Sequence, residues 1–131
     1  MMNREILFRA RRTDNGQWIY GYYLGAFNGA DIDEISDIDS ITGVRYEVDP
    51  STVEQYTGLT DKNGVKIFEG DIVRYGDTIH EVVFEQRNGT AYFGLVYSPL
   101  ETLPFGHYQD LRQITVIGNI HDNPELMEAR P

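Results

Sequence analysis

The sequence predicts an all-β protein, and three observations support this prediction. Aromatic residues make up 12% of the chain and include nine Tyr, a residue that favours strands and half-buried surfaces. Thirteen Gly and five Pro provide many turns. Short runs of alternating apolar and polar residues recur between those turns, as in hairpin-linked strands. At 131 residues, with 40% hydrophobic and 24% charged residues, the chain is long enough for one domain with a buried core.

A β-hairpin opens the chain. Residues 5–10 form its first predicted strand, Asn15-Gly16 supplies the positive φ angles of a tight turn, and residues 18–24 form its second strand. Gly21 interrupts the second strand, which indicates a bulge or a close approach of another backbone.

Aromatic residues on the predicted strands have two interpretations, either core packing or a stacking platform for the bases of single-stranded nucleic acid. These residues are Trp18, Tyr20, Tyr22, Tyr23, Tyr92, Phe93 and Tyr97. Because Trp18, Tyr20 and Tyr22 share one face of their strand, a stripe that faces the core or another subunit is the favoured interpretation.

The segment 25–43 fits neither a helix nor a strand, because its acidic residues and its Ile residues recur at a spacing that satisfies neither period. We expect a mobile acidic loop with room for one helical turn. Its carboxylates form a candidate surface for a protein partner: Asp31, Asp33, Glu34, Asp37 and Asp39. A calcium site is disfavoured, since no Glu closes the loop at the spacing that an EF-hand requires.

The rest of the chain continues as a meander. Strands are predicted at 44–48, 52–57, 67–68, 72–75, 78–85, 90–97 and 113–120, with a long loop at 98–111. The order of elements after residue 67 suits a small SH3-like barrel. Asn123 and Pro124 then begin a short C-terminal helix. We expect one domain over 1–131, made of an N-terminal hairpin and acidic-loop region at 1–54 and a barrel region at 55–131.

Several residues between 58 and 71 combine turn chemistry with carboxylates. They are Gly58, Asp61, Asn63, Gly64, Glu69, Gly70 and Asp71. Glu69 and Asp71 lie close enough in sequence to suggest acid–base chemistry or a hard cation. A structural role is favoured, because an Asp that follows Gly at the start of a strand commonly accepts backbone N–H bonds of the preceding turn. The same reasoning applies to Asp61 and Asn63.

No pattern in the sequence predicts a catalytic or metal site. The chain has no Cys, which excludes disulfides and cysteine-ligated zinc. Its three His residues lack the spacing of metal ligands, no Ser lies in a nucleophile elbow, and no phosphate-binding loop is present. We therefore predict that the protein is not an enzyme and has no cofactor.

Charge and hydropathy limit the partners. Eleven basic residues against 21 acidic ones give a net charge of −10, which disfavours non-specific binding of nucleic acid and favours a basic protein partner. No apolar run resembles a signal peptide or approaches a membrane span. A cytoplasmic protein without membrane contact is the expectation.

Three segments resemble one family. Residues 55–73, which read Gln-Tyr-Thr-Gly-Leu-Thr-Asp-Lys-Asn-Gly-Val-Lys-Ile-Phe-Glu-Gly-Asp-Ile-Val, are similar to the central signature of the YopX family of phage and prophage proteins. Residues 4–10 and 116–126 are similar to its first and last strands. The resemblance implies one YopX-like, β-rich domain that acts in a bacterial host cell. It implies no catalytic residue, cofactor or substrate.

Three hypotheses about function follow. The first is a non-enzymatic phage accessory protein that binds another protein and forms a homo-oligomer. The second is a nucleic-acid-binding barrel whose positive face would be made by Arg9, Arg11, Arg12, Lys62, Lys66 and Arg74. The third is an acidic DNA mimic that uses the carboxylates of 31–39 to occupy a host DNA-binding protein.

Overall fold

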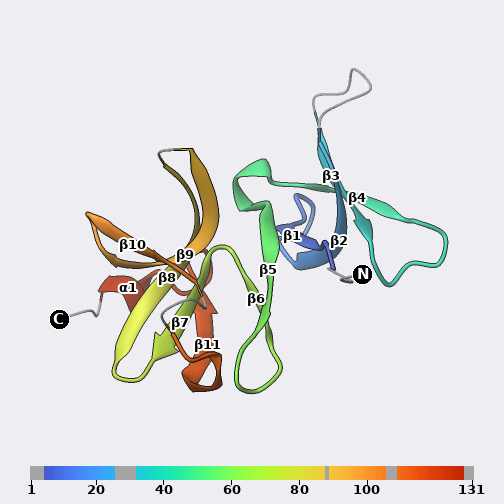
Figure 1. The fold of residues 1–131 in the computed structure, drawn as a ribbon. Coiled ribbons are helices and arrows are strands. Elements are labelled where there is room, and N and C mark those ends of the chain that lie inside the picture. Colours follow the sequence, from blue (N-terminus) through green and yellow to red (C-terminus); the bar gives the residue numbers. More distant parts are fainter. Residues whose placement is uncertain (1–4, 26–31, 88, 106–108, 129–131) are drawn as a thin grey trace, which may run out of the picture. The chain divides into compact units, whose positions relative to one another are not determined.

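The computed structural model describes residues 5–25, 32–87, 89–105 and 109–128. The chain forms two compact units, Met1–Tyr56 and Thr57–Pro131. Antiparallel strands make up most of both units, and the helices among the described residues are short, so the all-β prediction is confirmed (Figure 1). No helix in this described part of the chain is long and apolar enough to cross a membrane.

The first unit is built on a sheet with the order β4-β3-β2-β1-β5. Its strands are β1 (Phe8–Arg11), β2 (Trp18–Leu24), β3 (Asp33–Asp37), β4 (Arg45–Val48) and the start of β5 (Glu54–Thr60), and a 3-10 turn, Pro50–Thr52, precedes β5. The predicted hairpin is confirmed, because β1 and β2 pair from Phe8↔Gly21 to Arg11↔Trp18.

The prediction of a loop over 25–43 is wrong for residues 33–37. These residues form β3, which pairs with β2 on one side and β4 on the other. Ile35 is fully buried in the row that joins Tyr23 to Tyr46. Burial of Ile35 between two partner strands outweighs the weak local pattern, because strand formation depends on neighbours that the segment itself does not contain.

One face of this sheet forms the core of the first unit. Ala10, Ile19, Ile35 and Val48 are buried there, and Phe8, Tyr23, Tyr46 and Val53 pack against them. Gly21 lies on the same face, where an added Cβ would overlap the backbone carbonyl oxygen of Ser36. The predicted close backbone approach at Gly21 is therefore confirmed.

The second unit contains a five-stranded sheet with the order β10-β9-β8-β7-β11. Its strands are β7 (Asp71–Tyr75), β8 (Thr78–Arg87), β9 (Thr90–Ser98), β10 (Glu101–Pro104) and β11 (Ile114–Asn119). The last part of β5 pairs with β6 (Lys66–Phe68), the turn η2 (Leu111–Gln113) precedes β11, and the helix α1 (Glu125–Glu128) follows it. The pairing order runs from β10 to β11, and the predicted closure into an SH3-like barrel is not seen among the described residues.

One local prediction for this unit is wrong. Residues 101–104 of the predicted loop form β10, which pairs with β9 across a bulge between Glu101 and Thr102. This strand depends on a partner outside the local segment. The predicted short C-terminal helix is present at Glu125–Glu128. The carbonyl oxygen of Asn123 accepts the backbone N–H of Leu126 at 3.1 Å, and its side-chain Oδ1 accepts that of Asn119.

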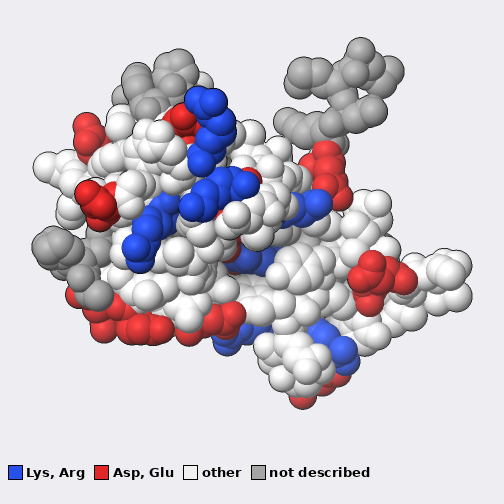
Figure 2. Space-filling model, turned by 90° about the horizontal axis from the view of Figure 1, so that it is seen from below, with Lys and Arg blue, Asp and Glu red and all other residues white. Residues whose placement is uncertain are grey.

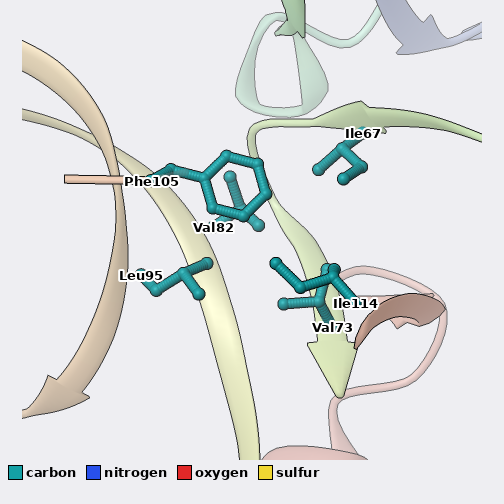
Figure 3. Close-up of a cluster of buried hydrophobic side chains, with 6 residues drawn as sticks. All are labelled: Ile67, Val73, Val82, Leu95, Phe105 and Ile114. Atoms are coloured by element: carbon teal, nitrogen blue, oxygen red, sulfur yellow. The ribbon is translucent and has the colours of Figure 1, made fainter. Parts of the chain in front are cut away.

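The core of the second unit lies between strands that are far apart in sequence. Six buried side chains converge on it (Figure 3): Ile67, Val73, Val82, Leu95, Phe105 and Ile114. Their removal from water is the main driving force for packing this sheet. The half-buried Leu59 and Leu111 pack against this cluster from its margin.

Candidate interaction surfaces

The acidic residues predicted as a partner surface do not share one face. Asp31 lies outside the described residues. In β3 successive side chains alternate, so Asp33 and Asp37 lie on the side of the buried Ile35 while Glu34 lies on the other. Asp39 follows in the turn after the strand. The strand therefore divides the charges that a continuous loop would have presented together.

Some of these carboxylates also support local structure. The Tyr23 hydroxyl donates a hydrogen bond of 2.6 Å to Asp33, and this bond raises the pKa of Tyr23 above its ordinary value, with a smaller contribution from burial. Asp37 accepts the backbone N–H of Asp39 at 2.9 Å. These two carboxylates are thus partly engaged in holding the sheet and the turn that follows it.

A small polar cavity of about 190 Å³ lies beside Asp37 and Asp39. The Arg12 guanidinium lines it, 4.0 Å from the centre of the Tyr46 ring, and donates two hydrogen bonds to Asp14, at 2.9 and 2.6 Å. These bonds raise the pKa of Arg12 and lower that of Asp14. Arg12 therefore offsets part of the acidic charge at this end of the sheet.

Trp18, Tyr20 and Tyr22 were predicted to face the core or another subunit, and the core alternative is wrong for the two tyrosines. Tyr20 is 40% exposed and Tyr22 is 59% exposed, whereas Ile19, which lies between Trp18 and Tyr20, is buried. The three aromatic residues do share one face of β2, as the alternation indicates. That face is the outer one, because the aliphatic Ile19 and the closely packed Gly21 occupy the core side.

Two arginines of β1 lie over the Trp18 ring. The Cζ atoms of Arg9 and Arg11 are 4.9 and 5.3 Å from the ring centre, within the range of a cation–π contact. Arg9 also donates to Glu54 through Nε, and its Nη2 lies 2.9 Å from the same oxygen. We call Trp18, Tyr20 and Tyr22, with Arg9 and Arg11, the aromatic face.

The other aromatic residues fulfil the core-packing prediction more closely. Tyr23 packs against the core of the first unit, and Phe93 and Tyr97 pack against that of the second. Tyr92 is half-buried, and its hydroxyl donates to the carbonyl of Thr102 at 3.3 Å.

In the second unit, the carboxylate of Asp61 ties a turn to β11. Its Oδ1 accepts the backbone N–H groups of Asn63 and Val65, at 2.8 and 3.0 Å, and its Oδ2 accepts that of Val116 at 3.0 Å. Burial alone would raise the pKa of Asp61, but the three amide bonds outweigh it and the pKa is lowered. Gly64 completes the turn with a φ of 80°.

Asp71 has a similar environment at the next corner. It is 2% exposed, and its Oδ2 accepts the backbone N–H of Phe68 at 2.7 Å. Gly70 precedes it with a φ of 87°, and Glu69 is half-buried. Gly58, at the other end of the signature, has a φ of 89°. The carboxylates of Asp61 and Asp71 thus accept hydrogen bonds from the backbone that surrounds them.

A cavity of about 390 Å³ lies next to the Asp61 turn. Half-buried Leu59 and Leu111 contribute its apolar lining, and Lys62 and Arg112 contribute exposed cations. A backbone hydrogen bond from Lys62 N to Ile114 O, 3.0 Å long, holds the two halves of the lining together. We call this the Lys62–Arg112 pocket. Figure 2 shows Lys and Arg side chains next to one another on the face seen from below.

The six basic residues of the predicted positive face are divided between the units. Arg9, Arg11 and Arg12 belong to the first unit, and Lys62, Lys66 and Arg74 belong to the second. Arg9 and Arg12 form ion pairs with Glu54 and Asp14. Three of the six therefore belong to each unit, and the second unit also contains Arg112.

His80 is a buried histidine of the second unit. His80 is 2% exposed, with Nδ1 2.9 Å from the carbonyl oxygen of Val96 and Nε2 2.7 Å from the hydroxyl of Thr78. Since a carbonyl oxygen only accepts, Nδ1 carries a proton there. Within the described ranges no group of three His, Asp or Glu side chains could hold a metal ion. His107 lies outside those ranges.

The sequence did not reveal the Lys62–Arg112 pocket. Residues 58–62 and 111–112 meet only because the Asp61 turn binds to the start of β11, and no local pattern reports that contact. For the aromatic face, the sequence does contain an indication of which side of β2 is buried. Aliphatic residues are buried more completely than Tyr, so Ile19 favours the core side over its aromatic neighbours.

Comparison with known proteins places the chain in a family. The family described as YopX protein matches residues 7–128. The fold is similar to the crystal structure of protein EF1440 from Enterococcus faecalis, with 27% sequence identity, a TM-score of 0.55, and coverage of 95% of this chain and 99% of that one. No curated protein matches the chain. Because the match spans nearly the whole sequence, the chain belongs to the YopX family.

Proposed function

We propose that the protein is a non-enzymatic accessory protein of a phage or prophage, and that it acts through protein–protein contact that includes self-association. The observation that carries this proposal is the aromatic face of the first unit. Trp, Tyr and Arg are the residue types that contribute most binding energy at protein interfaces. Here Trp18, Tyr20, Tyr22 and the half-buried Arg11 occur together on one side of β1 and β2, next to the buried Arg9.

The aromatic face is preorganised for contact. Arg9 is held by Glu54, and Arg9 and Arg11 hold the Trp18 ring, so a partner would order few additional side chains on binding. Each side chain that is already fixed lowers the entropic cost of association. Tyr20 and Tyr22, which are 40% and 59% exposed, supply apolar area together with a hydroxyl that can bond across an interface.

The charges around this face favour a second copy of the chain as one partner. Arg45 lies in the cross-strand row of Ser36 and Tyr22, and Glu47 lies in the row of Glu34 and Leu24. Both rows point to the side of the aromatic face. A twofold dimer pairs each patch with itself, so a rim that contains both signs can be self-complementary even when the net charge is −10.

Sedimentation velocity over a range of protein concentrations tests this proposal. The wild type should form dimers as concentration rises, and the double variant Tyr20→Ser/Tyr22→Ser should remain monomeric. Phe84→Ser is the matched control, because it removes an aromatic residue that is 43% exposed from a strand of the second unit. A monomeric wild type, or a double variant that dimerises like the control, contradicts the proposal.

A nucleic-acid-binding function is the second candidate, favoured by the presence of Lys62, Lys66, Arg74 and Arg112 in the second unit. It requires oligonucleotide binding that weakens steeply with added salt. Flat titrations at low salt would exclude it. The acidic DNA mimic has less support, because β3 divides Asp33 and Asp37 from Glu34. Neutralising Asp31, Asp33, Glu34, Asp37 and Asp39 together would have to abolish binding of a host DNA-binding protein.

A further inference from the structure

We propose that the Lys62–Arg112 pocket of the second unit binds a short acidic peptide segment of a partner protein, with an aliphatic side chain on its apolar lining and carboxylates on its two cations. This goes beyond self-association through the aromatic face, since it concerns another unit and another kind of ligand. All the lining residues belong to the second unit: Gly58, Leu59, Thr60, Asp61, Lys62, Leu111 and Arg112.

The apolar part of the pocket has the character of a side-chain site. Leu59 and Leu111 are half-buried and pack against the core, so their remaining surface is presented by a firmly held base. A cavity of about 390 Å³ is in the size range of small ligand sites and can hold one aliphatic side chain with adjoining backbone. Placing such a side chain on the two leucines removes apolar surface of both partners from water.

The polar part favours carboxylates. The Arg112 side chain is 89% exposed, and its Nε and Nη2 each donate a hydrogen bond of 3.0 Å to Asp110. These two bonds use two of the five N–H groups of the guanidinium, and the other three can bind a ligand. Lys62 is exposed on the turn opposite. The nearby Asp61 directs both of its oxygens to backbone amides, so its charge is already compensated where a ligand carboxylate would approach.

The same features favour a peptide over nucleic acid. Bases bind to single-strand sites by stacking on aromatic rings, and the apolar lining here is made of two leucines. Two cations beside Asp61 and Asp110 release few counterions from a phosphate backbone. A partner segment with one or two carboxylates next to Leu, Ile or Val matches both the charge and the lining.

Selection from a displayed library of short random peptides, followed by fluorescence anisotropy on the enriched peptides, tests the proposal with the full chain. We expect enriched peptides to share an aliphatic residue flanked by Asp or Glu. Lys62→Glu and Arg112→Glu should each weaken their binding by about tenfold or more, because each reversal turns an attraction into a repulsion. Asp110→Asn should strengthen binding, since it frees guanidinium donors while Asn keeps an oxygen for the turn.

Arg45→Glu serves as the charge-matched control in the first unit. It should leave peptide binding unchanged and weaken dimerisation, whereas Lys62→Glu should leave dimerisation unchanged. The two proposals can thus fail independently.

Three outcomes would overturn the peptide proposal: no peptide is enriched, the enriched peptides lack acidic residues, or the wild type and the Lys62 and Arg112 variants bind with equal affinity. Equal competition by a short oligothymidylate would assign the pocket to nucleic acid. Circular dichroism of each variant establishes that it is folded.

Discussion

The two units provide their buried carboxylates with polar partners by different means. In the first unit, Glu54 is paired with Arg9, and each side chain is 6% exposed. In the second unit, Asp61 and Asp71 are 6% and 2% exposed, and both accept hydrogen bonds from backbone amides. A buried charge without compensation is costly, so each unit must supply a partner.

The difference lies in what each arrangement fixes. The Arg9–Glu54 contact joins residues that are 45 positions apart, and it holds β1 against β5 in the register that pairs Arg9 with Glu54. The amide bonds to Asp61 close a turn within four residues and then reach Val116. The ion pair therefore selects a strand pairing, whereas the amide-bound carboxylates shape corners and attach them to the sheet.

Breaking the ion pair is expected to have the largest effect on stability. Arg9→Ala leaves Glu54 buried without its cation, and loss of one partner of a buried pair costs about 3–5 kcal/mol. Urea unfolding followed by the fluorescence of Trp18, the chain's one tryptophan, measures the loss for the first unit.

Replacing both Arg9 and Glu54 separates the cost of leaving one charge unpaired from the net contribution of the ion pair to stability. Because two well-packed apolar side chains often equal a buried ion pair, Arg9→Met/Glu54→Leu should recover most of the stability lost in Arg9→Ala. A double variant that is no more stable than Arg9→Ala would mean that the pair itself contributes strongly to the fold.

Removing the carboxylate of Asp61 should cost somewhat less stability than breaking the Arg9–Glu54 ion pair. Asp61→Ala leaves the N–H groups of Asn63, Val65 and Val116 without their acceptor, at about 2–4 kcal/mol in total, since water can reach part of an exposed turn. Hydrogen–deuterium exchange of the amides in β7 and β11 measures the loss in the second unit.

Asp77→Ala is the control for this comparison, because it removes an exposed aspartate from a turn of the same unit. It should change the free energy of unfolding by less than about 0.5 kcal/mol. If Asp61→Ala were as mild as Asp77→Ala, the view that amide bonds to this carboxylate hold the corner would be wrong.

This contrast also explains how far the sequence could predict the structure. The Asp61 turn and the Asn15-Gly16 hairpin depend on residues within a few positions, so the identity of Asp, Asn and Gly was sufficient. β3 and β10 depend on strands elsewhere in the chain, and their own residues carry no clear period. Pairing supplied by the rest of the fold made them strands.

The candidate sites also combine features that nearby residues predict with features that depend on distant parts of the chain. Alternation along β2 showed that Trp18, Tyr20 and Tyr22 share a face, but the choice of the outer side was made by Ile19 and by the approach of Ser36 to Gly21. The sequence places Lys62 between the predicted turn residues Asp61 and Asn63. The proximity of Lys62 to Leu111 required the hydrogen bond to Ile114, about fifty positions away, which no local pattern reports.

Unfolding at different pH values should show how much the ionised carboxylate of Asp61 contributes to stability. The folded state lowers the pKa of Asp61, so its ionised form stabilises the fold above the ordinary Asp value, and this contribution is lost as the pH falls through the lowered pKa. The wild type should therefore lose stability below about pH 4 more steeply than Asp61→Asn. Urea unfolding at several pH values measures both slopes, and parallel slopes would show that Asp61 is not the group responsible.

Glu81 should give the smallest effect, and one of opposite sign. Burial raises the pKa of this half-buried carboxyl, and the nearby His121 lowers it only in part. An acid whose folded pKa is raised binds its proton more tightly in the folded state, so stability is lost as the pH rises from the ordinary Glu value through the raised one.

Glu81→Gln removes the buried charge and should stabilise the protein at neutral pH by less than about 1 kcal/mol, because water screens a half-exposed group. Thermal unfolding at neutral pH compares the two proteins, and a less stable Glu81→Gln variant would mean that the attraction to His121 outweighs the cost of burial. Glu81 differs from Asp61 in having no backbone amide among the causes of its shift, so the opposite signs would show that amide bonds, rather than depth of burial, decide whether a carboxylate of this unit stabilises the fold when ionised.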